Sequence, residues 1–524
     1  MTTLLEQLCG WASALTLDQV PVRVVELAKS QLLSQLAAIR AGLAHPAGRT
    51  LLALFGPPLQ PDPARSAAVL AGLGSWLHFD DTAYAGHLSN STVAVPVGYA
   101  HHLGLSGADL LTAVIAANEC AARITAATTL GPFRGQPAAH TSLAGAICGR
   151  LRCVGAPAGR WVDALGLAFA MPGWNLTHGF FASDARLLGS AVPVRAGLDA
   201  CDAAAAGFRG APDILEHPNG FLARFATVPV PDAVTAGLGV RWHTETLSFK
   251  VHPSGPGTDA AVDCALGLHR EIGPLTADAV AEVVVHTSLY TLLVDRAAAA
   301  YLRPDFPVSA LVSTTPYAVA TALLSGALRP ADFARPAVDA ADRWALAGKV
   351  RLVHDEAMTA ALLGTTAPFG EAIRQAGDRA AGWLRDFGGD RLVELLGPPG
   401  QPAASFEHAT KATPARVEVR MNGRGLHHRQ VDIPVGAIGP ATRRSHRELV
   451  RAKFLGTGGP VEVADGAARL AAVRTADPPA PRRGAVLTPD GAAAGRCRRG
   501  TVLAQDGAYA GTVRWRAAGS TASG

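Results

Sequence analysis

The stretch His78–His102 reads HFDDTAYAGHLSNSTVAVPVGYAHH and leads from one apolar segment into another. Two adjacent carboxylates, Asp80 and Asp81, precede a turn-rich segment that places His87 in a loop. An imidazole exchanges protons near neutral pH, and a neighbouring carboxylate fixes its tautomer and raises its basicity. The stretch therefore predicts proton transfer by His87 with support from Asp81. The same residues also suit a plain loop whose side chains cap a helix.

The length and composition indicate a globular protein with more than one core. Of its 524 residues, 49% are hydrophobic and 17% are charged, which is typical of a chain that forms two or three domains. No run of about twenty apolar residues lacks a polar break, so we expect no membrane partner. The N-terminus has no basic signal region. We therefore expect a cytoplasmic protein.

The cysteines and the net charge exclude several other classes. The seven cysteines are scattered and odd in number, which predicts buried thiols in a reducing compartment rather than a disulfide framework. No Cys/His cluster has the spacing of metal ligands, so no metal site is predicted. The net charge is only +5. Much of this excess lies in a C-terminal tail without stacking aromatics, so no nucleic-acid partner is expected.

The pattern of apolar residues changes along the chain. Up to about residue 255, apolar residues recur at intervals of three and four, which predicts helices. Farther on, AVAEVVVHT and KVRLVHDE predict strands, and alternation on both sides of Asn422–Gly423 predicts a hairpin. We therefore expect a mainly α fold with a large all-helical domain and a smaller α/β domain. The expected ranges are 1–255 (helical domain), 256–405 (core of the α/β domain), 406–440 (its β-hairpin), 441–478 (return to the helical domain) and 479–524 (a Gly/Ala/Arg-rich tail).

Several segments share both their residues and their order with one protein family. FDDTAYAGHLSNSTVAVPVGYA is similar to its DDT…H-P-S…P block, NECAARI to its E-x-x-x-R helix, and FKVHPSGPGTDAAVD to its K-x-x-P…D segment. TTPYAVATALLSG and ELVRAKF are similar to its tyrosine-containing helix and its closing K-F element. Over roughly residues 3–475 the chain thus resembles the MmgE/PrpD family of 2-methylcitrate dehydratases, cis-aconitate decarboxylases and iminodisuccinate epimerases.

The resemblance implies a fold and a set of site residues. It implies a helical domain with an α/β lid, an active cleft between them, a homodimer, and no metal or organic cofactor. His87 stands at the position of the family's loop histidine, an acid/base, and Asp80 and Asp81 match its acid pair. Lys250 matches a lysine that would clamp a carboxylate. Tyr317 matches a tyrosine proposed as an acid or hydrogen-bond donor.

At the positions of the family's polar pocket residues, the match is only partial. His78 stands where some members have an aspartate that orients the substrate. Arg186 replaces a lysine, which keeps the charge and adds a bidentate fork, and His140 lies one place off a second family histidine. Two further candidates are His252, beside the lysine segment, and Trp174, in a polar-aromatic loop that would line a pocket. We expect these five residues, together with Asp80, to bind substrate.

These residues predict a cofactor-independent lyase of the dehydratase type, or an isomerase, acting on a small acid. His87 would remove a proton α to a carboxylate or carbonyl. Lys250 and Arg186 would hold the developing charge, because preorganised cations stabilise such intermediates strongly. Tyr317 or His252 would deliver a proton. Two alternatives stay open: an isomerase or cyclase acting on a larger, less charged biosynthetic intermediate, and a non-catalytic descendant that only binds a ligand.

Overall fold

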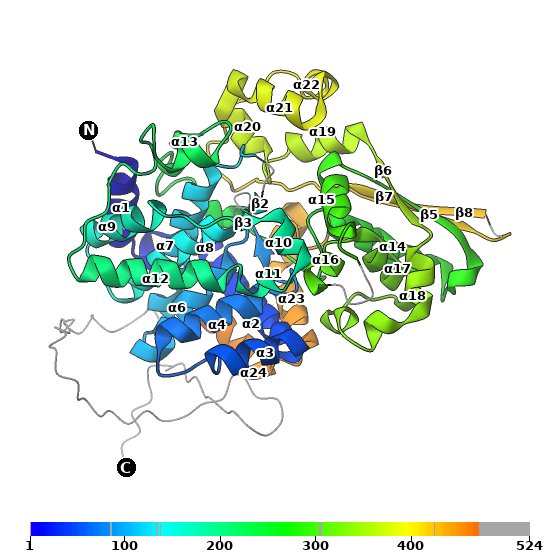
Figure 1. Ribbon diagram of the computed structural model, residues 1–524, viewed down its shortest axis with the longest axis horizontal. Coiled ribbons are helices and arrows are strands. Elements are labelled where there is room, and N and C mark those ends of the chain that lie inside the picture. Colours follow the sequence, from blue (N-terminus) through cyan, green and yellow to red (C-terminus); the bar gives the residue numbers. More distant parts are fainter. Residues whose placement is uncertain are drawn as a thin grey trace, which may run out of the picture.

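The protein is mainly helical, with one small sheet in its C-terminal half (Figure 1). The structure is a computed structural model that describes residues 2–83, 86–132, 135–136, 138–302, 307–423 and 425–470. Figure 1 shows a large helical body beside a smaller domain that contains the sheet. The predicted combination of a large helical domain and a smaller α/β domain is therefore confirmed. The expected tail, 479–524, lies outside the described residues.

Helices rich in alanine and glycine build the helical body. They are α1 (Leu4–Ala14), α2 (Val22–Ala44), α3 (Pro46–Phe55), α4 (Pro63–Ser75), α5 (Ser89–Thr92), α6 (Ala94–Leu103), α7 (Gly107–Ala126), α8 (Ala138–Cys153), α9 (Ala158–Phe169), α10 (Thr177–Ala182), α11 (Ala185–Leu188), α12 (Ala191–Ala205) and α13 (Phe221–Phe225). Small residues let these helices approach closely: a Cβ on Gly145 would lie 2.2 Å from Ser91 Oγ. This close approach holds α5, which follows the His87 loop, against α8.

In the described part of the chain, every helix is too short or too polar to traverse a lipid bilayer. The six cysteines among the described residues are buried and free of disulfides, as their scattered spacing predicts.

The smaller domain is built on a four-stranded sheet. Its strands, β5 (Val280–Thr287), β6 (Val350–His354), β7 (Ala415–Met421) and β8 (Gly425–Val431), lie in the order β6-β5-β7-β8. The β5–β6 pair is parallel and the other pairs are antiparallel. Alternate side chains such as Val283 and Val419 are buried in one core with α14 (Thr258–Ile272) and α17 (Thr315–Ser325). The hairpin turns at Gly423, whose φ of +72° suits glycine.

Helices that connect the strands complete this domain and its contact with the body. They are α15 (Leu289–Ala299), α16 (Val308–Val312) and α18 (Ala341–Ala347). Farther along the chain, α23 (Pro440–Gly456) and α24 (Val461–Arg469) lie against α2 of the helical body. Two short ladders lie in the body: β1 (Asp81–Thr82) pairs with β4 (Ser248–Phe249), and β2 (Gly135–Gln136) pairs with β3 (Asn175–Leu176).

Four helices in the range expected for the α/β domain lie instead on the helical body. They are α19 (Glu356–Gly364), α20 (Gly370–Ala376), α21 (Ala380–Gly388) and α22 (Asp390–Leu396). Their apolar residues, Trp383 among them, belong to the core of the body. Trp383 Nε1 also donates to Gly131 O at 3.1 Å, and Arg241 forms a buried ion pair with Glu371. These helices therefore contact the body, although they lie in the range 256–405 that we expected for the α/β domain. Periodicity identifies an apolar helix face but not the core that this face joins.

Candidate functional site

The loop after β1 brings together a histidine and a buried carboxylate. His87 Nδ1 lies 2.7 Å from Asp80 Oδ2, which also accepts a hydrogen bond from Asn90 Nδ2 at 2.6 Å. Because Nδ1 faces the carboxylate, Nε2 is the ring nitrogen left to exchange a proton with a bound molecule. Asp80 is fully buried, so its charge is weakly screened and stabilises an imidazolium strongly. His87 and Asp80 therefore form an oriented acid/base pair.

Asp81 has a structural role that differs from the prediction. Its Oδ1 accepts hydrogen bonds from the backbone N–H groups of Leu88 at 3.2 Å and Ser89 at 3.1 Å. Its Oδ2 accepts a hydrogen bond from Gln31 Nε2 at 2.7 Å. Burial raises the pKa of Asp81, and the nearby charge of Asp80 raises it further. The carboxylate that contacts the imidazole is thus Asp80 rather than the predicted Asp81, which holds the start of α5.

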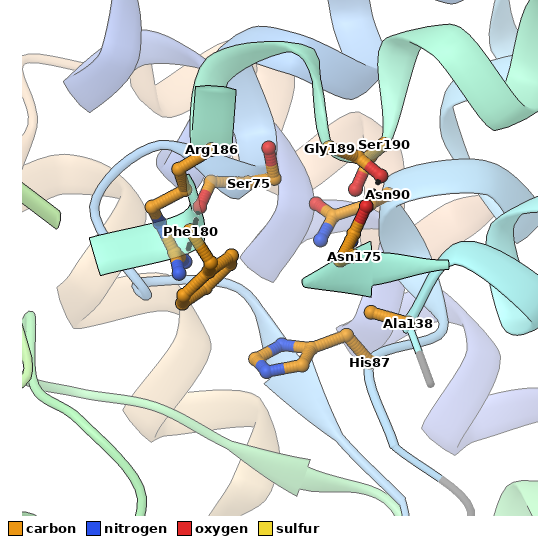
Figure 2. A pocket seen from close by; sticks show the side chains of 9 residues that line it. All are labelled: Ser75, His87, Asn90, Ala138, Asn175, Phe180, Arg186, Gly189 and Ser190. Atoms are coloured by element: carbon orange, nitrogen blue, oxygen red, sulfur yellow. Dashed lines mark hydrogen bonds between the residues drawn. The ribbon is translucent and has the colours of Figure 1, made fainter. Parts of the chain in front are cut away.

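His87 lines a small pocket, shown in Figure 2. The lining residues are Ser75, His87, Asn90, Ala138, Asn175, Phe180, Arg186, Gly189 and Ser190. The space among them, including the part open to solvent, is about 260 Å³. In Figure 2 the imidazole of His87 points toward Phe180 and the guanidinium of Arg186. The pocket thus places an acid/base group opposite a cation.

Arg186 is a buried cation with one unused hydrogen-bonding edge. Its Nε donates to Trp76 O at 2.9 Å and its Nη2 to Ser75 O at 2.6 Å. The guanidinium carbon lies 4.9 Å from the centre of the Phe180 ring. Among the described residues, Nη1 has no hydrogen-bond partner, and burial is the only influence that acts on the charge of the side chain. Burial lowers the pKa of Arg186 well below its usual value, so a bound anion would relieve the cost of this charge.

His78 lies directly against His87. The two rings are nearly parallel, with centroids 5.5 Å apart, and His78 is also 6.1 Å from the ring of Phe180. His78 is buried, and neither ring nitrogen has a hydrogen-bond partner in the described ranges. Its φ of +48° is in the left-handed region. Strained backbone and unpaired buried polar atoms occur preferentially at functional sites. Both features agree with a role of His78 in substrate binding, which remains a prediction.

Two lysines hold the segment that contains Asp80, immediately before β1. The backbone N–H of Lys250 donates to Asp80 O at 3.2 Å, and its Nζ lies 3.5 Å from Asp259. Lys453 Nζ donates to Ser34 Oγ at 2.8 Å and to the carbonyl of Phe79. Burial lowers the pKa of Lys453 to about 7. We predicted Lys250 but missed Lys453, although it belongs to the ELVRAKF segment.

Two other predicted residues lie apart from the pocket lining. The hydroxyl of Tyr317 donates to Asp332 O at 2.6 Å, and its ring lies 5.1 Å from that of Trp344 in the core of the α/β domain. His252 Nε2 lies 3.3 Å from Asp263 Oδ1. Both polar groups are thus engaged within the protein, and the structure does not bring either of them to His87.

His140 and Trp174 belong to an aromatic cluster beside the pocket. The His140 ring centroid lies 5.3 Å from that of Trp174, 4.9 Å from Phe221 and 4.8 Å from Phe225. Burial lowers the pKa of His140 to about 4, although the carbonyl of Gly173 opposes the shift. His140 is therefore neutral in the folded protein over the physiological range of pH.

The lowered pKa of His140 predicts a loss of stability in acid. Between pH 6.5 and about 4, the unfolded chain binds a proton at this residue and the folded chain does not, so acid favours unfolding. Relative to His140→Phe, we expect the free energy of unfolding of the wild-type protein to fall by about 2–3 kcal/mol over this interval. Urea unfolding at several pH values measures the difference. If the free energy of unfolding fell equally with pH in both proteins, the pKa of His140 would not be lowered by folding.

Comparison with protein families gives two adjoining matches. Residues 6–232 match the MmgE/PrpD N-terminal domain, and residues 252–379 match the MmgE/PrpD C-terminal domain. The chain belongs to the MmgE/PrpD family. This family includes dehydratases and related lyases and isomerases, and its members are generally enzymes. A comparison with curated proteins finds no match.

The two family domains meet close to the site. The segment between the matched ranges contains β4, the strand that pairs with β1 beside Asp80. Within the described residues, no group of three or more His, Cys, Asp or Glu side chains is arranged to hold a metal ion. The pocket residues Asn90, Asn175, Phe180 and Ser190 are additions to the predicted substrate-binding set. Of these, only Asn175 had a sequence signal, since it follows Trp174 in the polar-aromatic loop.

Proposed function

We propose that this MmgE/PrpD protein is a lyase or isomerase that removes a proton α to the carboxylate or carbonyl of a small acid. One observation carries the proposal. The His87–Asp80 pair, joined at 2.7 Å, lines the same pocket as Arg186, a buried cation whose Nη1 has no partner among the described residues. A base and an anion-binding cation in one small pocket are the groups that enolate chemistry requires.

Each group has a defined task in this mechanism. Nε2 of His87 accepts the α proton, and the buried carboxylate of Asp80 stabilises the imidazolium that forms. Arg186 binds the carboxylate of the substrate and stabilises the negative charge that develops on it. The imidazolium then protonates a departing β-hydroxyl group, which leaves as water, or returns the proton to carbon. The first outcome is a dehydration and the second is an isomerisation, and we favour dehydration.

The size of the pocket supports a small substrate. The space of about 260 Å³ among its lining residues includes the part open to solvent, so the enclosed part is smaller still. Its lining also contains the polar side chains of Asn90, Asn175 and Ser190. These features favour a small acid over the larger, less charged intermediate of the alternative hypothesis. An imidazole held by a buried carboxylate favours catalysis over simple ligand binding.

Hydrogen–deuterium exchange tests the proposal directly. The protein is incubated in D2O with a panel of small hydroxy acids and unsaturated acids, and NMR follows loss of the α-proton signal. We expect exchange with the wild-type protein and at least a 100-fold slower exchange with His87→Gln, in line with the usual contribution of a general base. His102→Gln, which alters an exposed histidine on α6, is the matched control. Equal exchange rates in wild type and His87→Gln would overturn the mechanism.

A further inference from the structure

The carbonyl groups that hold Arg186 lie at the end of α4. Its Nε donates to Trp76 O at 2.9 Å and its Nη2 donates to Ser75 O at 2.6 Å, a contact visible in Figure 2. Ser75 is the last residue of α4, and Trp76 follows it with a fully buried side chain. A guanidinium binds a carboxylate well only when its planar fork is correctly oriented. The position of Trp76 therefore determines how Arg186 meets a ligand.

The indole of Trp76 is bound by a buried histidine. Trp76 Nε1 donates to His45 Nδ1 at 2.9 Å, and the backbone N–H of Ala47 donates to the same atom at 3.2 Å. An indole N–H can only donate, so Nδ1 carries no proton. The ring proton is then on Nε2, which lies 3.2 Å from Phe333 O and donates to it. One neutral tautomer of His45 therefore satisfies all three hydrogen bonds.

His45 joins the two domains of the protein. It lies between α2 and α3 of the helical body. Phe333 ends the short 3-10 helix Pro330–Phe333, and its ring centroid lies 5.8 Å from that of Tyr317 in the core of the α/β domain. The imidazole thus connects a carbonyl of the α/β domain to the indole of Trp76. Because Trp76 also supplies a carbonyl to Arg186, this connection reaches the pocket.

The surroundings of His45 favour its neutral form. Burial lowers the pKa of His45, and the hydrogen bond from Nε2 to the carbonyl opposes this shift. The charge of Arg49 on α3 adds to the lowering, whereas that of Asp184, just before α11, opposes it. On the side of the α/β domain, Asp332 adjoins the accepting carbonyl but is paired with Arg343 at 2.9 Å. His45 is therefore neutral at neutral pH and gains its proton only in acid.

We propose that His45 is a positioning residue for the anion site: the neutral imidazole ties Trp76 to the α/β domain and keeps Arg186 oriented, and protonation releases Trp76. The inference rests on the proposed function, in which Arg186 binds the carboxylate of the substrate. A proton on Nδ1 would face the indole N–H, so the charged ring cannot accept this hydrogen bond. The buried indole N–H would then lack a partner, which is unfavourable. Carboxylate binding should therefore weaken as the solution becomes acidic.

Two substitutions separate the hydrogen bonds of His45 from the space that it fills. In His45→Gln the amide oxygen can accept from Trp76 and the NH2 group can donate to Phe333 O, whereas His45→Phe offers neither. Isothermal titration calorimetry with formate at about pH 7.5 measures binding at Arg186. We expect His45→Phe to bind formate about 5- to 50-fold more weakly than wild type, because a loosely held guanidinium is poorly oriented. His45→Gln should stay within about threefold of wild type.

The dependence on pH gives a readout that a purely structural role would not change. Formate remains largely ionised down to about pH 5, so its own protonation contributes little. Between about pH 7.5 and about pH 5, we expect formate binding by the wild-type protein to weaken at least about threefold relative to His45→Gln, because glutamine gains no charge. The ratio of the two affinities removes the influence of other titrating groups, His87 among them. The matched control, His102→Gln, alters an exposed histidine on α6 and should follow wild type at every pH.

The indole signal of Trp76 tests the same link without a ligand. Its N–H resonance in heteronuclear NMR, assigned as the one missing in Trp76→Phe, should shift with pH in wild type and stay constant in His45→Gln. These two measurements decide the question even if His45→Phe does not fold. Wild-type formate affinity in His45→Phe, equal losses in His45→Phe and His45→Gln, or the same pH dependence in wild type and His45→Gln would overturn the inference.

The role of His45 and the proposed function fail in different ways. Formate binding that is lost in Arg186→Met but unchanged in both His45 variants would refute the role of His45 alone. A wild-type protein that binds no formate would refute the anion site of the proposed function. The pH response of the Trp76 indole would then still show whether His45 holds Trp76 in its neutral form.

Discussion

Asp80→Asn is expected to slow α-proton exchange by about 10²- to 10⁴-fold without unfolding the protein. The carboxylate of Asp80 holds His87 Nδ1 at 2.7 Å and stabilises the imidazolium that forms when Nε2 accepts a proton. A neutral amide cannot supply that stabilisation, and its NH2 group favours the tautomer in which Nε2 already carries a proton. The measurement is the NMR exchange rate in D2O, with far-UV circular dichroism as the check on folding.

Asp81→Asn is the matched control for this prediction. The two aspartates are adjacent and fully buried, but Asp81 binds the backbone at the start of α5 rather than the imidazole. We expect Asp81→Asn to change the exchange rate of the folded protein by less than 10-fold. A larger loss in Asp81→Asn than in Asp80→Asn would mean that the original prediction of Asp81 as the partner of His87 was right.

Arg186→Met is expected to weaken the binding of small carboxylates by about 30- to 1,000-fold, which corresponds to roughly 2–4 kcal/mol. Arg186 is buried, and its Nη1 has no partner among the described residues, so a ligand carboxylate would be its counter-ion. Titration calorimetry with acetate and succinate measures the loss. Ligand-dependent thermal stabilisation measures it independently, because a ligand raises Tm only when it binds the folded state.

Arg186→Lys separates the charge from the geometry of the guanidinium. Lysine keeps the positive charge but lacks the planar fork that binds a carboxylate through two parallel hydrogen bonds. Lysine also has a single nitrogen, so it cannot reproduce the two hydrogen bonds that Nε and Nη2 donate to the Trp76 and Ser75 carbonyls. We expect affinity between those of wild type and Arg186→Met. Carboxylate binding by Arg186→Met at the wild-type level would exclude the guanidinium as the anion site.

Much of the fold could be predicted because local patterns determine it. The period of apolar residues separates the helices of the body from β5 and β6, and Asn422–Gly423 marks the β7–β8 hairpin. The order of several motifs was sufficient to identify the family, which its N- and C-terminal domain matches confirm. The helices α19–α22 lie in the range expected for the α/β domain, yet their apolar residues share the core of the helical body. The pattern of an amphipathic helix shows that one face is buried, but not which core that face joins.

The site was less predictable than the fold. His87, Asp80 and Arg186 were visible as residue types that suit acid/base and anion-binding chemistry. Tyr317 was an equally good candidate from the sequence, yet its hydroxyl donates a hydrogen bond to Asp332 O inside the α/β domain.

The sequence by itself determined the helical body, the small sheet, the family and the histidine loop, because each depends on residues that are close together in the chain. Only the tertiary structure decided which aspartate serves His87. Asp80, in the bend before β1, contacts the imidazole, whereas Asp81, the first residue of β1, binds the backbone at the start of α5. The tertiary structure also decided which cations lie near the site, because long-range packing brings Arg186 into the pocket with His87, and Lys250 beside Asp80, from separate segments.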